Sequence, residues 1–90
     1  MDLTNKEELL ELKKWLDAML KIEKVTVTFI KQDGSERVMK CTNNPIYIQN
    51  ENYAVIENNS NVVCTVYDIE INDWRSFHYD SIKRIEFSLE

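Results

Sequence analysis

The chain has 90 residues, 43% of them hydrophobic, and a formal net charge of −5 at pH 7. This length and composition predict one domain, residues 1–90, with a packed core, and they exclude wholesale disorder. Residues 43–72 contain no Lys or Arg, so the sequence lacks the broad basic surface through which proteins bind duplex phosphates.

The sequence indicates a cytoplasmic protein that does not contact membranes. No apolar run reaches the ~18 residues of a membrane span. The first ten residues, MDLTNKEELL, are acidic where a signal peptide is basic and then apolar. Cys41 and Cys64 lie in apolar runs without CxxC or Cys–His spacing. We therefore expect two buried, free thiols in a reducing compartment.

Residues 4–21 are predicted to form an amphipathic helix. Thr4 and Glu7 have the spacing of a capping box. Lys13 and Asp17 fall on the polar side of this helix. The opposite side is expected to be buried, because apolar residues recur there at spacings of three and four: Leu9, Leu12, Leu16, Met19 and Leu20.

Residues 24–42 have the pattern of a β-hairpin, with apolar residues in alternate positions and the only glycine, Gly34, between the two runs. A three-residue loop pairs Val27 with Met39 and keeps the apolar face apolar, whereas a two-residue loop would place Val27 opposite a lysine. We therefore predict the three-residue loop, with Gly34 in the left-handed conformation. In that register Arg37 lies opposite Phe29, toward one end of the apolar face.

The rest of the chain is predicted to contain one long connection and several short strands. Residues 43–61 form the connection, with a short edge strand at 53–57. Strands follow at residues 62–71, 74–80 and 83–90, with a one-turn link before the last of them. The core is expected to include four residues of this region: Phe77, Tyr79, Ile82 and Ile85.

This element order predicts a mostly β (α+β) fold. The N-terminal amphipathic helix, residues 4–21, precedes a five-stranded, partly open antiparallel barrel of SH3-like or Sm-like type, residues 24–89. Curling the sheet toward a barrel buries one face and protects its edges. The helix is expected to pack against an open side or end of the barrel.

The sequence offers no catalytic, metal or cofactor set. His78 is the only histidine, and no acid is placed by spacing to orient it beside Ser76. Asp68, Glu70 and Asp73 do not match a calcium-loop pattern, and one glycine cannot build a phosphate-binding loop. We predict that the protein is not an enzyme and uses no cofactor or metal.

The aromatic and basic residues of the segment NDWRSFHYDSIKRI, residues 72–85, are the best candidates for a binding site. Strand alternation places Arg75 on the face of Phe77, where it would reach out from the barrel mouth. Trp74 and His78 fall on the other face, where they would stack on a base or grip a peptide; alternatively, Trp74 packs against the helix or the long connection. The candidate binding residues are Trp74, Arg75, His78 and Arg37, with Lys83 and Arg84 at the rim.

Two segments carry a family resemblance: VTFIKQDGSERVMKCT and VYDIEINDWRSFHYDSI. The Lys-x-Asp-Gly hairpin beginning at Lys31, and the run from Asp68 through Trp-Arg-Ser-Phe, resemble the short WYL-like proteins found mainly in tailed phages of the T-even type. The resemblance covers roughly residues 24–87. It implies an Sm-like, SH3-type β-barrel, in a family without a settled function.

The segment also resembles the closing strand of the larger WYL domains of bacterial regulators, with the pattern Arg-x-Phe-x-x-Asp-x-Ile. The resemblance implies that Arg75 and His78 occupy places implicated in sensing nucleic acids or nucleotides. His78 stands where those domains usually have arginine, and Val62–Cys64 replaces their Trp-Tyr-Leu tripeptide. The chain also has no helix-turn-helix segment, so direct reading of an operator is not implied.

The resemblance and the residues together lead to three functional hypotheses. The first is a non-enzymatic phage accessory module that binds and modulates a host or phage macromolecule, most simply a protein. The alternative is a ligand-sensing module for a nucleotide or short single-stranded nucleic acid, whose affinity would fall steeply with salt. The third is a homo-oligomeric ring that pairs through the 53–57 edge.

Overall fold

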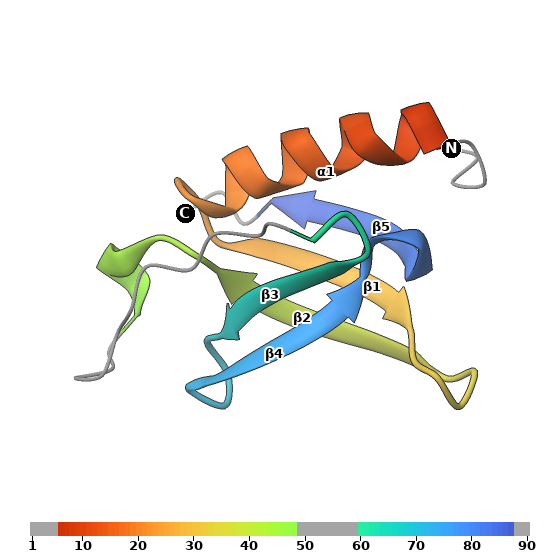
Figure 1. The fold of residues 1–90 in the computed structure, drawn as a ribbon. Helices are drawn as coiled ribbons and strands as arrows, with labels where there is room; N and C mark the ends of the chain where they lie inside the picture. The colour runs from red at the N-terminus through yellow and green to blue at the C-terminus, as the bar shows by residue number, and fades with distance from the viewer. Residues whose placement is uncertain (1–5, 49–59, 88–90) are drawn as a thin grey trace.

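The computed structural model describes residues 6–48 and 60–87, and Figure 1 shows the whole fold. The predicted cap at Thr4 and the predicted edge strand at 53–57 lie outside the described residues. The elements are α1 (Lys6–Leu20), β1 (Val25–Ile30), β2 (Glu36–Thr42), η1 (Pro45–Tyr47), β3 (Val63–Asp68), β4 (Asp73–His78), η2 (Tyr79–Ser81) and β5 (Ile82–Phe87), where η marks a 3-10 helix.

The five strands form one antiparallel sheet in the order β4-β3-β2-β1-β5. β2 and β3 pair over two positions at the end of β2, Cys41 with Asp68 and Thr42 with Tyr67. Beyond this corner the β3–β4 hairpin crosses β1 and β2 (Figure 1). The sheet is curled but not closed, because β4 and β5 are its two edges. The predicted helix followed by a partly open, five-stranded antiparallel sheet is thus confirmed.

The β1–β2 hairpin has the predicted register. Val27 pairs with Met39, and Phe29 pairs with Arg37. Gly34 has a φ of 88°, in the left-handed region that glycine occupies at no steric cost. The loop closes with a hydrogen bond from the Lys31 amide to the Ser35 carbonyl, at 2.8 Å. Alternation and the position of the glycine were sufficient to set this hairpin.

Helix α1 covers one open side of the curled sheet, above the strands in Figure 1. Its apolar stripe contributes Leu12, Leu16 and Leu20, as predicted, to a core that also contains residues from every strand of the sheet. Both cysteines are free and fully buried. Phe77, Tyr79 and Ile82 lie in this core and Ile85 packs against it, in agreement with the sequence.

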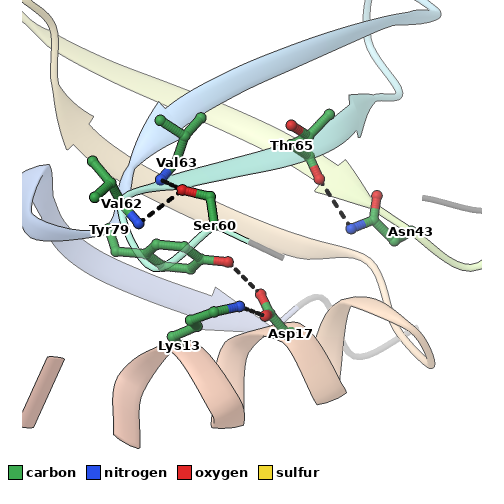
Figure 2. Close-up of polar contacts among 8 residues, drawn as sticks. All are labelled: Lys13, Asp17, Asn43, Ser60, Val62, Val63, Thr65 and Tyr79. Carbon is green, nitrogen blue, oxygen red and sulfur yellow. Dashed lines mark hydrogen bonds and ion pairs between the residues drawn. The ribbon is translucent and has the colours of Figure 1, made fainter. Parts of the chain in front are cut away.

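The helical pattern placed Lys13 and Asp17 on the polar, solvent-facing side of the helix. The structure shows instead that both side chains are partly buried. Their side chains are only 13% and 19% exposed. The Tyr79 hydroxyl donates a hydrogen bond to Asp17 Oδ1 at 2.6 Å, and Lys13 Nζ pairs with Asp17 Oδ2 at 2.6 Å (Figure 2). We call these three residues the α1–η2 contact. Lys13 and Asp17 are partly buried because η2 brings the buried Tyr79 against the flank of the helix, next to its apolar stripe.

The start of β3 is held by local hydrogen bonds, and the residue after β2 is tied to β3 by a long-range one. Ser60 Oγ accepts from the amides of Val62 and Val63, both at 3.0 Å. Asn43 Nδ2 donates to the Thr65 carbonyl at 3.1 Å (Figure 2). These bonds fix where the β3–β4 hairpin leaves the sheet corner. Within the described residues, no helix has the length and apolar character needed to cross a membrane.

Candidate functional site

A recess of about 340 Å³ opens between the β1–β2 hairpin and the segment formed by β4 and η2. We call it the β1–β4 recess. It lies where the two halves of the curled sheet face each other, so its two walls come from strands that are not neighbours in the sheet. The residues that line it are Phe29, Ile30, Lys31, Gln32, Arg37, Met39, Val63, Arg75, Ser76, Phe77, His78, Asp80 and Ser81.

The floor of the recess is apolar and rigid. The rings of Phe29 and Phe77 are stacked, with centroids 5.1 Å apart and planes inclined by 21°. Both phenylalanines are almost fully buried, and Met39 beside them is 2% exposed. Stacked rings in a close-packed core change position little, because neighbours restrict their rotamers. The floor is therefore a preformed apolar surface.

The rim of the recess combines three cationic side chains, one histidine and one carboxylate, and Lys31 is already paired with Asp33 at 3.9 Å. Lys31, Arg37, Arg75 and His78 line it together with one carboxylate, Asp80. Arg75 is exposed, and within the described part of the chain no ion pair or side-chain hydrogen bond engages its guanidinium. An arginine in this state keeps all five of its N–H donors available. Arg75 is thus the group most ready to bind a negatively charged partner.

Arg37 differs from Arg75 because its guanidinium is paired with a buried carboxylate, that of Asp68. Its Nη2 lies 3.4 Å from Asp68 Oδ2. Asp68 is 2% exposed, and its Oδ1 accepts a hydrogen bond from the Glu70 amide at 3.0 Å. A buried carboxylate requires a nearby positive charge or several donors. Arg37 therefore contributes to the fold as well as to the rim. Its predicted place opposite Phe29 did not indicate this pairing with Asp68.

The structure brings together only some of the residues that the sequence had selected. Arg37, Arg75 and His78 all line the recess. Arg75 and His78 come from opposite faces of β4, and both reach the opening because β4 is an edge strand. Sequence reasoning missed Lys31 and Asp80 as lining residues. Both stand in the motifs that carry the family resemblance, Lys31 at the start of Lys-x-Asp-Gly and Asp80 in Arg-x-Phe-x-x-Asp-x-Ile, and this was the signal that could have selected them.

The other three candidates are not among the residues that line the recess. Trp74 is half-buried and packs edge-on against Tyr67, with ring centroids 5.3 Å apart. Lys83 Nζ pairs with Glu36 at 3.2 Å. Arg84 pairs with Glu86 at 3.6 Å and lies opposite Thr28, on the face of the sheet that does not carry Phe29. Their observed contacts are with the protein itself.

The buried polar groups near the core have little capacity for nucleophilic chemistry. Burial raises the pKa of the Cys64 thiol to about 12, and burial also raises the pKa of Cys41 above its usual range. At neutral pH both remain neutral thiols, which are poor nucleophiles. In the recess itself, the Ser81 hydroxyl donates to the His78 carbonyl at 2.6 Å. What the recess offers is positive charge and apolar surface.

Comparison with protein families gives a match over residues 13–83, to the family model described as WYL_2, Sm-like SH3 beta-barrel fold. No curated protein and no solved structure matches the chain significantly. The matched segment begins within α1 and ends within β5, so it includes the curled sheet and the β1–β4 recess. Because the match covers most of the 90 residues, the chain belongs to the WYL_2 family of Sm-like, SH3-type β-barrel proteins.

Proposed function

We propose that this protein is a non-enzymatic binding module that attaches to another macromolecule, most simply a protein, through the β1–β4 recess. The observation that carries the proposal is the guanidinium of Arg75, which no ion pair or side-chain hydrogen bond engages among residues 6–48 and 60–87, at the rim of a recess floored by Phe29 and Phe77. Arginine and aromatic residues around a desolvated pocket are the typical components of energetic hot spots in protein interfaces.

The resemblance to short WYL-like phage proteins supports a more specific role. On that basis we propose that the module acts in the cytoplasm of an infected bacterial cell, as a phage accessory protein that modulates a host or phage protein. The recess is small and lies on a small domain, so the expected interaction is local docking of one segment of the partner.

The nucleotide or single-strand alternative has less support from the geometry. Base stacking requires an aromatic face that is open to the ligand. Trp74 packs edge-on against Tyr67, and the rings of Phe29 and Phe77 are stacked on each other and buried. Arg75 and His78 remain as contacts for a phosphate, but among the residues that line the recess no open aromatic face accompanies them.

A capture experiment tests the proposal. Tagged wild-type protein and two variants, the double variant Arg75→Ala/His78→Ala and the control Arg84→Ala, are recovered from infected cells with and without nuclease treatment. Mass spectrometry quantifies the bound proteins. We expect a stoichiometric partner with the wild type and with Arg84→Ala, and its loss with the double variant. Equal recovery with all three proteins, or no partner at all, would overturn the proposal, whereas a partner lost only on nuclease treatment would favour the alternative.

A further inference from the structure

From the chemistry of the recess we infer the kind of segment that it binds: a carboxylate next to an apolar side chain, as in an acidic, hydrophobic stretch of a partner protein. The inference rests on the proposed function, because it names the ligand of the same site. It is carried by the charges at the rim, by the state of each cation and by the size of the apolar floor.

The recess gathers cationic side chains in a molecule with a net charge of −5. Lys31, Arg37 and Arg75 line the opening with the carboxylate of Asp80, but Lys31 Nζ lies 3.9 Å from Asp33 and Arg37 lies 3.4 Å from Asp68. Charges beyond about 8–10 Å are largely screened at physiological ionic strength. Among the lining cations, Arg75 is the one that no carboxylate within the described residues already pairs, so a group bound in the recess responds chiefly to Arg75, which favours an anion.

The two arginines have different parts in this site. Arg37 is already shared with the buried Asp68, 3.4 Å away, which fixes its position but satisfies part of its charge. Arg75 has no such partner within the described residues. A guanidinium binds a carboxylate through two parallel hydrogen bonds, which gives direction as well as attraction. Arg75 is thus the expected anchor for the ligand carboxylate, with Arg37 as a fixed positive neighbour.

The size of the recess limits what accompanies that carboxylate. A volume of about 340 Å³ is at the lower end of the ~300–1,000 Å³ of ligand pockets. The apolar floor consists of Phe29, Phe77 and Met39, which line the recess and are almost fully buried. One apolar side chain fits this surface better than a larger ligand.

Asp80 favours a singly charged ligand over a phosphate. Its carboxylate lines the recess and is exposed. A phosphate monoester carries a charge of about −1.5 to −2 at pH 7, so it meets more repulsion from Asp80 than a carboxylate does. Arg75, Asp80 and the apolar floor together define an acidic, apolar peptide segment as the preferred ligand.

The test uses 3-phenylpropanoate, a small molecule that joins one ring to one carboxylate. Amide proton–nitrogen NMR spectra of the ¹⁵N-labelled full chain are recorded while the probe is added up to about 20 mM, enough to detect millimolar affinity. We expect shifts at Phe29, Arg75 and Phe77. The neutral isostere 3-phenylpropanamide should bind about fivefold or more weakly, since it lacks the charge that pairs with Arg75.

Two variants that each remove one positive charge distinguish binding at Arg75 from a general effect of the protein's net charge. Arg75→Gln should weaken binding of 3-phenylpropanoate about fivefold or more, while Arg84→Gln, on the other face of the sheet, should leave it unchanged. The amide spectrum of each variant shows directly whether it is folded. Equal loss with both variants, or equal binding of the acid and the amide, overturns the inference.

Phenyl phosphate tests the competing ligand chemistry on the same site. Binding weaker than that of 3-phenylpropanoate supports the carboxylate assignment, and clearly tighter binding overturns it in favour of a phosphate ligand. Absence of any shift with all three probes also overturns it. The proposed function has a separate outcome: a partner captured in an Arg75-dependent manner, with no response to these probes, keeps the binding module and rejects only the ligand class.

Discussion

Tyr79 connects the helix to the candidate site. It lies between His78 and Asp80, which both line the β1–β4 recess, while its hydroxyl donates to Asp17 on α1 at 2.6 Å. Burial, and then the hydrogen bond to Asp17, raise the pKa of this phenol above its usual range. The phenol therefore remains protonated at physiological pH and acts as a permanent donor to the helix.

We predict that Tyr79→Phe lowers the free energy of unfolding by about 1–2 kcal/mol, because Asp17 loses a hydrogen bond in a partly buried place. Tyr47→Phe is the matched control. Tyr47 contacts Lys24 through its ring, 5.2 Å from the ammonium to the ring centroid, and that contact survives the change. Urea unfolding of both variants measures the difference. Similar stabilities for the two variants would show that the α1–η2 contact is not stabilising.

The buried thiols are predicted to be unreactive in the native protein. Cys41 and Cys64 are both fully buried, and burial raises the pKa of Cys64 to about 12. At pH 8 the thiolate fraction is then very small. Ellman's reagent should label neither thiol in native buffer and both in concentrated urea. Rapid labelling of one thiol without denaturant would contradict the buried arrangement.

At the scale of elements, the β1–β2 hairpin depends on one backbone conformation. Gly34 has a φ of 88°, and a Cβ built at this position would have no atom within 4 Å. A side chain at residue 34 therefore meets no steric obstacle from its neighbours, and any loss of stability comes from the backbone conformation itself. A substitution at residue 34 therefore tests the left-handed backbone conformation without a steric clash.

Gly34→Ala is predicted to destabilise the protein by about 1–2 kcal/mol, the cost of a left-handed conformation for a residue with a Cβ. Gly34→Asn should cost clearly less, because asparagine tolerates this conformation better than alanine does. Thermal or urea unfolding of the two variants compares them directly. If alanine were tolerated as well as asparagine, the left-handed conformation at residue 34 would not be needed.

The same element shows what sequence can predict. The register of β1 and β2 follows from the local sequence. With apolar residues at alternate positions and one glycine in the loop, the three-residue loop pairs apolar residues with apolar residues on the buried face. The contact between Asp17 and Tyr79 joins residues 62 positions apart, and no local pattern specifies such a distance. Asp17 lies at the edge of the apolar stripe, next to the buried Leu16. Whether Asp17 is covered therefore depends on which element packs against that flank of the helix.

At the scale of the whole molecule, the recess follows from the curl of the sheet. Arg37 lies on β2 and Arg75 on β4, with β3 between these strands in the sheet order. Sequence alternation gave the face on which each residue lies. It could not give the bend at the β2–β3 corner, which brings Phe29 and Phe77 into contact and so places the two arginines around one opening.

The protein is predicted to lose stability as the pH rises above about 9. The thiol of Cys64 has its pKa raised from 9.0 to about 12, and burial raises the pKa of Cys41 and of Tyr79 as well. Above pH 9 the unfolded chain releases protons that the folded chain retains. The unfolded state then binds fewer protons, so the free energy of unfolding falls with pH, by about 1.4 kcal/mol per pH unit for each such group.

Cys64→Ala tests the contribution of one group. The variant should show a slope between pH 9 and 11 that is shallower than the wild-type slope by up to about 1.4 kcal/mol per pH unit, whatever its stability at pH 8. Urea unfolding at successive pH values gives both slopes. The same slope for the two proteins would mean that the Cys64 thiol is not the buried acid that the structure describes.

The order of strands has a consequence for synthesis on the ribosome. β5, which is made last among the described strands, pairs with β1, and Tyr79 in η2 meets Asp17 in α1. Until β5 and η2 have emerged, one edge of β1 and the flank of the helix at Asp17 lack these partners. The nascent chain is therefore expected to remain unfolded until its last described strand is available, and then to fold on the millisecond-to-second timescale of proteins with many non-local contacts.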